Sequence, residues 1–276
     1  MSAPKQSIPD AEFYPHASAE AKKTVDAHQG DAPLKLYSGW FCPFVQRVWL
    51  VLEEKHIPYQ YIEVNPYHKP DSLLRLNPRG LVPTLEHDNK PLYESTVVME
   101  FLEDEYPDHK PNLRPDDPHE RARLRIWTDY VTTRIIPSFH RFLQFQPSSD
   151  TKGLDEKRQE FLGHLREWTA EMDEEGPYFS GKEPRLVDFQ MGPWAVRLWV
   201  FDLMKGGLGI PAEGQGGEHE KVWNRYRKWV KAIEGRDSVK ATTSEREHFL
   251  PLYQRYADNT AQSELAKATR SGRGVP

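Results

Sequence analysis

Cysteine is the residue this sequence most nearly lacks, because its 276 residues include only one, Cys42. A lone cysteine cannot close a disulfide within the chain, which excludes the small secreted proteins that are held together by disulfides. Zinc modules that use several cysteine ligands are excluded for the same reason. The one thiol is therefore either reactive or simply packed in the core.

Long apolar runs and an excess of one charge are also missing. The chain has 37 basic and 42 acidic residues and a net charge of −5, so it offers no broad basic surface for nucleic acid or an anionic membrane. No segment approaches the ~20 apolar residues of a membrane span. The N-terminus shows neither a secretory signal nor an arginine-rich presequence. We expect a protein of a reducing compartment, most simply the cytoplasm, without nucleic-acid or membrane partners.

The sequence divides into five segments. Residues 1–32 are polar, contain three prolines and show no convincing period, which predicts an extension that lies on the surface or is mobile. Residues 33–106 form a predicted α/β domain. Four prolines mark a linker at 107–118, and a helical pattern covers 119–268. The tail spans residues 269–276, and we expect its residues 270–276 to be disordered.

The α/β domain is predicted to have the order β-α-β-α-β-β-α. Its expected strands are 34–37, 59–64, 81–86 and 91–93, and its expected helices are 42–55, 71–76 and 94–105. Pro83 interrupts the third strand, and a proline inside a strand is normally confined to an edge or a bend. In the second half, the helical period covers 119–145, 155–174, 187–205, 219–234 and about 244–268.

Cys42 follows the first strand and opens the first predicted helix. At a helix N-terminus, the dipole and the unpaired backbone N–H groups favour the nucleophilic thiolate. A buried structural cysteine is the alternative for a single free thiol. Val45 occupies the place of a resolving thiol three residues later. A redox cycle at Cys42 would therefore need an external small thiol.

Two further motifs could bind a peptide ligand. Val82-Pro83 has the pattern of the cis-proline bend that faces the reactive cysteine in thioredoxin-like folds, where the preceding backbone can pair with an extended peptide. Glu94 and Ser95 lie at a predicted helix N-terminus, where hydroxyl and N–H donors could hold a carboxylate. As an alternative, these two residues only cap the helix.

Taken together, the motifs resemble those of the cytosolic glutathione transferases. They are FCPF at 41–44, Lys69 in HKP, LVPTLE at 81–86 and YES at 93–95, followed by an all-helical half. The CPF motif resembles the omega class, and residues 249–270 resemble its fungal members. The resemblance covers about residues 34–268. It implies a thioredoxin-like α/β N-terminal domain and an all-α C-terminal domain.

The resemblance also implies roles for these residues toward glutathione, the expected cosubstrate. Cys42 would form a mixed disulfide with it, and the Val82 backbone, beside Pro83, would pair with its cysteinyl unit. Glu94 and Ser95 would bind the γ-glutamyl end of glutathione, and Lys69 would bind its glycyl carboxylate. Phe44 would line the same site. In isolation, Lys69 could equally be an ordinary solvated lysine.

The family pattern places an acceptor pocket beside this site. Trp194 and Arg197 match the segment that borders that pocket, and Tyr253 matches a pocket tyrosine on the last helix. Aromatic residues on helices are more often core than substrate contacts. Among the 11 histidines we find no convincing pair of metal ligands, so we expect no metal. His140 and His164 lie in amphipathic helices and are interpreted as surface or core residues.

The resulting hypothesis is an omega-like glutathione transferase that transfers thiols through a Cys42–glutathione disulfide. Its acceptor would be a small electrophile or disulfide, and its activities deglutathionylation or dehydroascorbate-type reduction. One alternative is an enzyme that adds glutathione in a fungal secondary-metabolite pathway. Another is a non-catalytic regulatory module with the same fold. By analogy with the family, we expect a homodimer.

Overall fold

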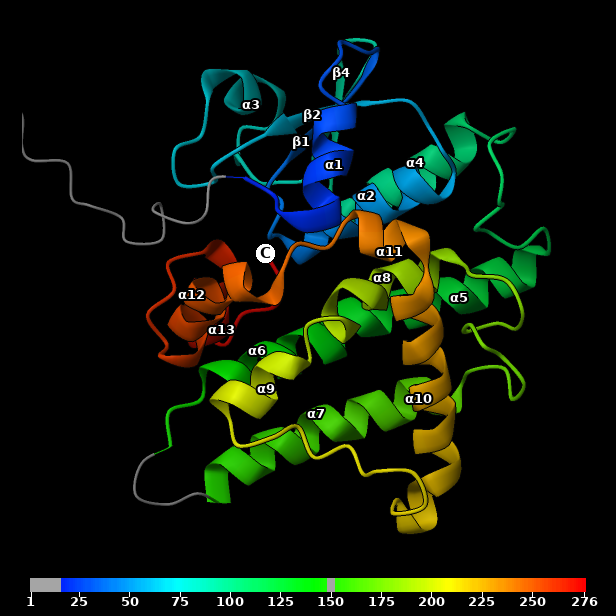
Figure 1. The fold of residues 1–276 in the computed structure, drawn as a ribbon, viewed down its shortest axis with the longest axis vertical. Helices are drawn as coiled ribbons and strands as arrows, with labels where there is room; N and C mark the ends of the chain where they lie inside the picture. The colour runs from blue at the N-terminus through cyan, green and yellow to red at the C-terminus, as the bar shows by residue number, and fades with distance from the viewer. Residues whose placement is uncertain (1–15, 148–151) are drawn as a thin grey trace, which may run out of the picture.

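The computed structural model describes residues 16–147 and 152–276. The α/β half and the helical half lie against each other along α2 (Pro43–Glu54) and α8 (Leu186–Ala195) (Figure 1). Every side of α2 is covered, so most of its residues are buried, including the polar Gln46 and Arg47. The N-terminus of this helix, where Cys42 is the N-cap, opens toward the junction of the two halves.

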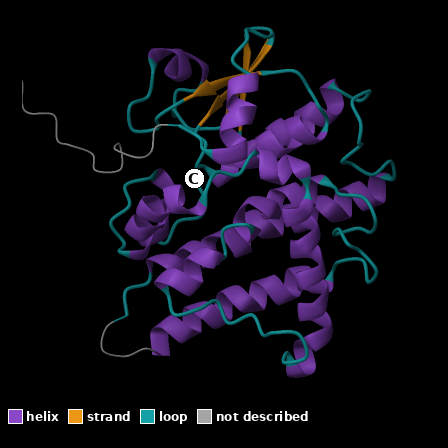
Figure 2. Ribbon diagram, viewed as in Figure 1, coloured by secondary structure: helices purple, strands orange, loops and turns teal. Residues whose placement is uncertain are grey.

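The N-terminal half contains a four-stranded sheet of order β2-β1-β3-β4 (Figure 2). Its strands are β1 (Leu34–Ser38), β2 (Gln60–Glu63), β3 (Thr84–His87) and β4 (Lys90–Tyr93). β1 is parallel to β2 and antiparallel to β3, and β3 is antiparallel to β4. Alternate side chains of β1 point to opposite faces, so Leu36 joins the main core and Tyr37 a smaller cluster with Leu73 of α3 (Asp71–Leu76). The predicted thioredoxin-like fold is confirmed.

The third strand is shorter than the sequence pattern predicts. The pattern indicates a strand over 81–86, whereas β3 begins at Thr84. Proline has no N–H for a ladder hydrogen bond, so Pro83 stays outside the sheet. The Val82–Pro83 peptide bond is cis, as the motif predicts. β4 then leads into α4 (Ser95–Glu105), which packs against α2.

The C-terminal half is helical, as expected. Its elements are α5 (Pro118–Tyr130), the π-helical turn η2 (Val131–Ile135), α6 (Ile136–Gln144), α7 (Lys152–Ala170), α8, α9 (Trp199–Met204), the 3-10 turn η3 (Gly217–His219), α10 (Glu220–Gly235), α11 (Asp237–Ala241), α12 (Arg246–Ala257) and α13 (Glu264–Arg270). No helix among the described residues has the length and hydropathy that crossing a bilayer requires.

Three of the expected long helices are divided in the structure, and α11 was not predicted. The segment 119–145 contains the π-helical turn η2 between α5 and α6. The segment 187–205 tightens after Ala195, where Arg197 N–H donates to Trp194 C=O at 3.0 Å. The segment 244–268 breaks at Asn259, whose φ is +59°. Ser263 then caps the new helix, because its hydroxyl accepts from Ala266 N–H at 3.1 Å. This break lets α13 turn back over α6.

The N-terminal segment is more ordered than expected. Residues 16–32 include a helix, α1 (Ala19–Ala27), which packs against α11. Ser18 anchors it, because its N–H donates to Ser244 Oγ at 3.1 Å and its hydroxyl accepts from Glu245 N–H at 3.1 Å. Of the two outcomes expected for this segment, residues 16–32 therefore lie on the surface, as an ordered and mostly exposed helix. Residues 1–15 lie outside the described residues.

The expectation of a disordered tail is wrong. After α13, Arg273 N–H donates to Ala268 C=O at 2.9 Å, which turns the chain inward. Val275 then packs against the main hydrophobic core. The last residues thus lie between the two halves of the molecule (Figure 1).

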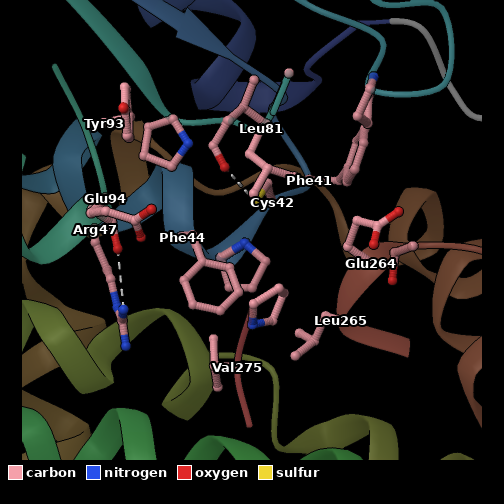
Figure 3. A pocket seen from close by; sticks show the side chains of 18 of the residues that line it. Phe41, Cys42, Phe44, Arg47, Leu81, Tyr93, Glu94, Glu264, Leu265 and Val275 are labelled. Carbon is pink, nitrogen blue, oxygen red and sulfur yellow. Dashed lines mark hydrogen bonds between the residues drawn. The ribbon is translucent and has the colours of Figure 1, made fainter. Parts of the chain in front are cut away.

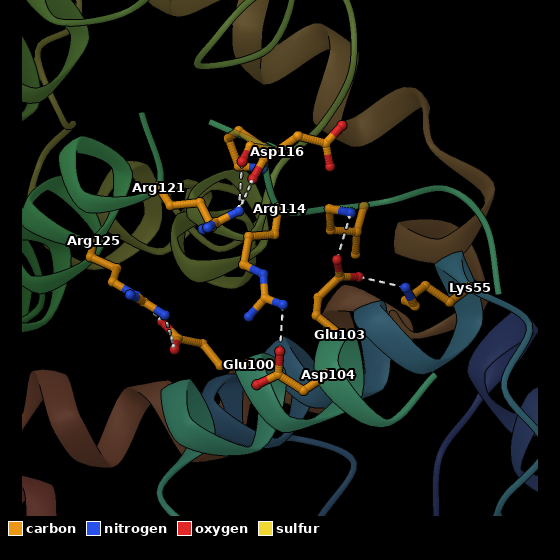
Figure 4. A network of polar contacts seen from close by, with 10 residues as sticks. Lys55, Glu100, Glu103, Asp104, Arg114, Asp116, Arg121 and Arg125 are labelled. Carbon is orange, nitrogen blue, oxygen red and sulfur yellow. Dashed lines mark hydrogen bonds and ion pairs between the residues drawn. The ribbon is translucent and has the colours of Figure 1, made fainter. Parts of the chain in front are cut away.

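Polar contacts hold the linker between the halves in place (Figure 4). Lys55 Nζ lies 2.6 Å from Glu103 Oε1, and both side chains are buried. The other Glu103 oxygen accepts from Leu113 N–H at 3.1 Å, and Arg114 pairs with Asp104. Since a buried charge is stable only when it is paired and hydrogen-bonded, the Lys55–Glu103 pair secures α2, α4 and the linker together.

Candidate functional site

A cavity of about 540 Å³ lies where the two halves meet (Figure 3). The N-terminal half contributes the start of α2, the loop before β3 and the start of α4. The C-terminal half contributes α6, α12, α13 and the tail. Phe41, Cys42, Glu94, Leu265 and Val275 all point into this region (Figure 3). The cavity therefore has one wall from each domain, and we call these walls the N-terminal wall and the C-terminal wall.

Cys42 is the N-cap of α2 and is half-buried in the N-terminal wall. Its backbone N–H donates to Gly39 C=O at 2.9 Å, which closes the loop after β1. Its Sγ lies 3.9 Å from the carbonyl oxygen of Val82. Pro43 occupies the first turn of α2, where its missing N–H costs no helical hydrogen bond. The predicted position of the thiol is confirmed.

The electrostatic environment of Cys42 differs from the expectation. Burial raises the pKa of the thiol above its ordinary value. The N–H groups of Val45 and Phe44 and the charges of Arg197 and Arg47 all act to lower this pKa, but they do not offset burial. The N–H groups at the helix N-terminus thus act in the expected direction, although burial raises the net pKa of the free thiol.

The backbone beside Cys42 offers an edge that is not part of the sheet. Val82 precedes β3, whose ladder begins at Thr84, so the Val82 amide takes no part in the sheet. Its carbonyl faces the Cys42 sulfur. An extended peptide laid along this edge would bring its own cysteine close to Cys42.

The start of α4 and Lys69 form the polar end of the N-terminal wall. Ser95 is buried, and its hydroxyl accepts from Arg47 Nη1 at 3.2 Å. Glu94 has a φ of +70° and forms a 2.8 Å ion pair with Arg79. Lys69 Nζ donates to Arg79 C=O at 3.1 Å. The structure thus brings together the predicted residues of the wall, and Phe44 and Pro83 line it as well.

Gly80 was not predicted, yet it shapes the position of Lys69. It has a φ of +60°, which favours glycine, and a Cβ there would lie 2.5 Å from Lys69 Cδ. Its signal in the sequence is the turn NPRG before the proline-containing segment. The lysine can lie across this turn only because residue 80 has no side chain.

Arg47 is another residue of the N-terminal wall that the sequence pattern does not reveal. It is buried and has no carboxylate partner among the described residues. Its guanidinium lies 4.6 Å from the Trp194 ring centroid and 5.1 Å from that of Phe44. Its Nε donates to the main-chain carbonyl oxygen of Gln190 at 3.0 Å. Burial lowers the pKa of Arg47 to about 9, so it remains a cation at neutral pH.

The three predicted acceptor residues are not all in the cavity. Tyr253 lines the C-terminal wall. Trp194 and Arg197 are only 1 % exposed and lie behind the wall. The Trp194 ring packs on Phe44 at 5.0 Å between centroids, and Arg197 Nη1 donates to Pro193 C=O at 2.5 Å.

Residues that sequence reasoning did not predict complete the C-terminal wall. They are His140, Leu252, Tyr256, Leu265, Val275 and Pro276, together with several polar residues at the start of α13. The wall is apolar and aromatic along α12 and the tail, and polar at the start of α13. It suits a ligand recognised by shape and apolar area.

One group of three potential metal ligands occurs among residues 16–147 and 152–276. It consists of Glu245, Glu247 and His248, and both carboxylates are exposed. His248 Nδ1 also lies 2.7 Å from Ser18 Oγ, in the contact that anchors α1. The expectation that the protein needs no metal stays a prediction.

Comparison with known proteins shows clear relatives. Residues 41–105 match the family described as glutathione S-transferase, N-terminal domain. Glutathione S-transferase omega-1 of Sus scrofa is 35 % identical over 190 residues, which cover 67 % of this chain and 77 % of the relative. Pyrimidodiazepine synthase of Drosophila melanogaster is 36 % identical over 182 residues, which cover 64 % of this chain and 69 % of the relative. The crystal structure of glutathione transferase Omega 3C from Trametes versicolor has a TM-score of 0.78 at 42 % identity and covers 90 % of this chain and 100 % of that chain.

Proposed function

Because the chain belongs to the glutathione transferases and is of the omega-like type, we propose that it transfers thiols through a disulfide between Cys42 and glutathione. The resemblance seen in the motifs is thereby confirmed, and the chain is an enzyme that uses glutathione. The proposed acceptors are disulfides of glutathione with small thiols and electrophiles carrying glutathione on an activated carbon. Dehydroascorbate-type reduction belongs to the same proposal.

One observation carries this proposal. The only thiol of the chain is the N-cap of α2, in the wall of the cavity, and it faces the backbone of the cis Val82–Pro83 bend. A thiol in this position can reach the sulfur of a peptide paired with that backbone. Since the chain has no second cysteine, the resulting disulfide must be resolved by a second molecule of glutathione.

The geometry of the N-terminal wall supports a place for each part of glutathione. Its cysteinyl unit would pair with the backbone of Val82. The γ-glutamyl carboxylate would lie at the start of α4 beside Ser95, where free N–H groups and the helix dipole favour an anion. Glu94 would accept from the γ-glutamyl ammonium group, and the glycyl carboxylate would meet Lys69. An extended anionic tripeptide thus matches the chemistry of this wall.

The proposed reaction consists of two thiol–disulfide exchanges. In the first, the Cys42 thiolate attacks the glutathione sulfur of the acceptor disulfide. The bond to the acceptor sulfur breaks, and that sulfur leaves with the electron pair and takes a proton from solvent. In the second, the thiolate of free glutathione attacks the glutathione sulfur on Cys42. This releases glutathione disulfide and restores the Cys42 thiolate.

The Cys42 thiolate needs help from its surroundings, because burial raises the pKa of this thiol. The N–H groups of Val45 and Phe44 point toward the sulfur, and the positive charges of Arg197 and Arg47 act on it. We propose that these groups stabilise the thiolate both as the attacking group and as the leaving group of the second exchange.

Replacing Cys42 tests the proposal directly. With a disulfide of glutathione and 2-mercaptoethanol as substrate, Cys42→Ala should lower kcat/KM by at least about a thousandfold, because it removes the nucleophile. Calorimetric titration should still detect glutathione binding, since the other contacts remain. Retention of full thiol transfer would overturn the proposed mechanism.

Two alternatives predict different results. A relative named for a synthase, pyrimidodiazepine synthase, favours a biosynthetic task on the same site. In that case the wild-type enzyme would act on one activated intermediate and poorly on simple disulfides. A non-catalytic module would bind no glutathione, or bind it and turn over none of these substrates.

We also propose a homodimer in a reducing, cytoplasmic environment. Apolar side chains are exposed along the edge formed by β4, α4 and α5, where Val97 is 53 % and Ile126 is 64 % exposed. Such a surface is suited to a partner subunit. Light scattering at micromolar concentration should give twice the mass of the chain, and a monomeric mass would contradict this assignment.

A further inference from the structure

His140 is a buried polar residue in the C-terminal wall, and the proposed chemistry does not use it. It lies on α6, lines the cavity and is 3 % exposed. Neither ring nitrogen has a hydrogen-bond partner among the described residues. Buried polar groups in proteins are nearly always paired, so an unpaired one at a ligand cavity points to a partner that arrives with the ligand.

The surroundings of His140 determine what kind of partner it can bind. Tyr256 on α12 lies beside it at 5.2 Å between ring centroids, and α12 and α13 both pack against α6. Burial lowers the pKa of His140 to about 3, so the ring is neutral at working pH. A neutral imidazole has one N–H donor and one acceptor nitrogen. It therefore suits an uncharged oxygen, such as a hydroxyl or a carbonyl, better than a carboxylate or a phosphate.

The rest of the wall adds a second requirement. Leu252, Tyr253 and Leu265 line the cavity with apolar and aromatic surface. The hydroxyl of Tyr256 is already within hydrogen-bond distance, 2.5 Å, of Ser263 Oγ. The two ring nitrogens of His140 remain buried and without a hydrogen-bond partner among the described residues.

From this geometry we infer that His140 determines acceptor specificity by hydrogen-bonding an uncharged hydroxyl or carbonyl oxygen on an aromatic acceptor. The inference rests on the proposed function, because it names the class of acceptor for the same site. The acceptor ring would pack against Tyr253 and Leu265, and its oxygen would replace the missing partner of the imidazole. His140 acts on binding and takes no part in the disulfide exchange.

A matched series of substrates tests this inference. Disulfides of glutathione with 4-hydroxythiophenol, 3-hydroxythiophenol and 4-methylthiophenol differ mainly in the group that would face His140. The wild-type enzyme should prefer one of the hydroxyl compounds over the methyl compound by about tenfold in kcat/KM. His140→Phe should abolish that preference, with the loss confined to the hydroxyl compound, and should not lower the melting temperature, because it leaves no buried polar group unpaired.

Two further variants separate recognition from packing. His140→Gln keeps a donor and an acceptor and should retain part of the preference. Tyr256→Phe removes a hydroxyl from the same wall that already has a partner, so it should leave the preference unchanged. Equal preference in the wild type and in His140→Phe would overturn the inference and leave thiol transfer standing. An equal loss of kcat/KM for all three substrates in His140→Phe would also overturn the inference and leave thiol transfer standing.

A binding measurement keeps the inference testable if none of the three disulfides is turned over, an outcome that would instead contradict the proposed function. In nitrogen-15 NMR spectra of the wild-type protein, 4-methylphenol should shift the His140 ring signals, and 1,4-dimethylbenzene, which matches its shape, should not. Equal responses to the two probes, or no response to either, would overturn the inference.

Discussion

The two walls of the cavity use different physical means to bind a ligand. The N-terminal wall presents backbone groups, a helix start and one lysine, all within a short stretch of the α/β half. The C-terminal wall presents mainly leucine and aromatic side chains from three helices and the tail, with polar residues at the start of α13. The first arrangement recognises the charges and peptide groups of one molecule. The second tolerates many shapes and takes its selectivity from a few polar groups.

This difference teaches how one fold can keep its cosubstrate and change its acceptor. Replacing a side chain cannot easily alter a backbone edge such as the one at Val82. In contrast, a substitution at Leu252, Leu265 or Val275 changes the volume of the C-terminal wall without touching the peptide groups opposite. We therefore expect mutations in the two walls to separate cleanly in their kinetic effects.

After the loss of Cys42 itself, the largest effect is expected for Arg47, whose charge supports the Cys42 thiolate. Arg47→Met keeps the length of the side chain but removes the cation, so the pKa of the thiol should rise further and its reactivity at pH 7 should fall about tenfold. The pH profile of iodoacetamide alkylation measures this. Because Cys42 is the only cysteine, the profile reports on this thiol alone.

Arg79→Met is the matched control, because Arg79 is an exposed arginine near the same site and pairs with Glu94. It should leave the alkylation profile where it is. If Arg47→Met also left the profile unmoved, the charge of Arg47 would have no role in activating the thiol.

A smaller effect, on the KM for glutathione alone, is expected when Gly80 is replaced. Gly80→Ala places a Cβ 2.5 Å from Lys69 Cδ, at a φ of +60°, so the lysine must move. The KM for glutathione should rise about fivefold as one charge-assisted contact is lost, with the KM for the acceptor unchanged. Gly163→Ala on α7, where nothing lies within 4 Å of the new Cβ, is the control and should change neither value. A parallel rise in both KM values would show that the two walls are not independent.

The opposite pattern, a change in the KM for the acceptor alone, is expected when Val275 in the C-terminal wall is replaced. Val275→Ala removes apolar contact area from the cavity lining and should raise the KM for an aromatic acceptor about threefold. The KM for glutathione should stay the same. Steady-state kinetics with each substrate varied in turn would detect the change, and an unchanged acceptor KM would mean that the tail does not contribute to binding.

The smallest effect is expected on the thermal stability of the protein, through Glu63. Glu63 Oε1 accepts from Trp40 N–H at 3.3 Å in the loop that leads to Cys42, and burial raises the pKa of Glu63 to about 7. Because the folded pKa lies above the ordinary value of 4.5, ionisation costs stability as the pH rises from about 4.5 to about 7. Glu63→Gln should therefore melt a few degrees higher than the wild type at pH 8, with a smaller gain at pH 5. A difference that is independent of pH would show that the Glu63 charge is not the cause.

The sequence was most informative where the structure depends on local chemistry. Helix 71–76 has the predicted bounds, and the helix that begins after Cys42 ends one residue before the predicted end. Alternating side chains, a proline at the first turn and the NPRG turn each act over a few residues. For the same reason, the positions of Cys42, Pro83 and Ser95 follow from local signals. The roles of Lys69 and Phe44 came only from the family resemblance, and Gly80 and Arg47 were not predicted.

The C-terminal wall could not be predicted, because its members meet only through tertiary packing. Val275 follows a polar tail, and nothing near it indicates that it reaches the core. α1 was missed because Ala21 is the only residue of that helix that is buried. His140 was interpreted as an ordinary histidine, since no pattern along the chain shows that a ring lacks a partner.

The most direct test of the central claim is the intact mass of the protein during turnover. After brief exposure to a glutathione mixed disulfide, the wild-type chain should carry one glutathione, mapped to Cys42, and free glutathione should remove it at a rate no slower than kcat. If thiol transfer proceeds while no glutathione appears on Cys42, or if the adduct forms and is released more slowly than turnover, thiol transfer through a Cys42–glutathione disulfide is contradicted.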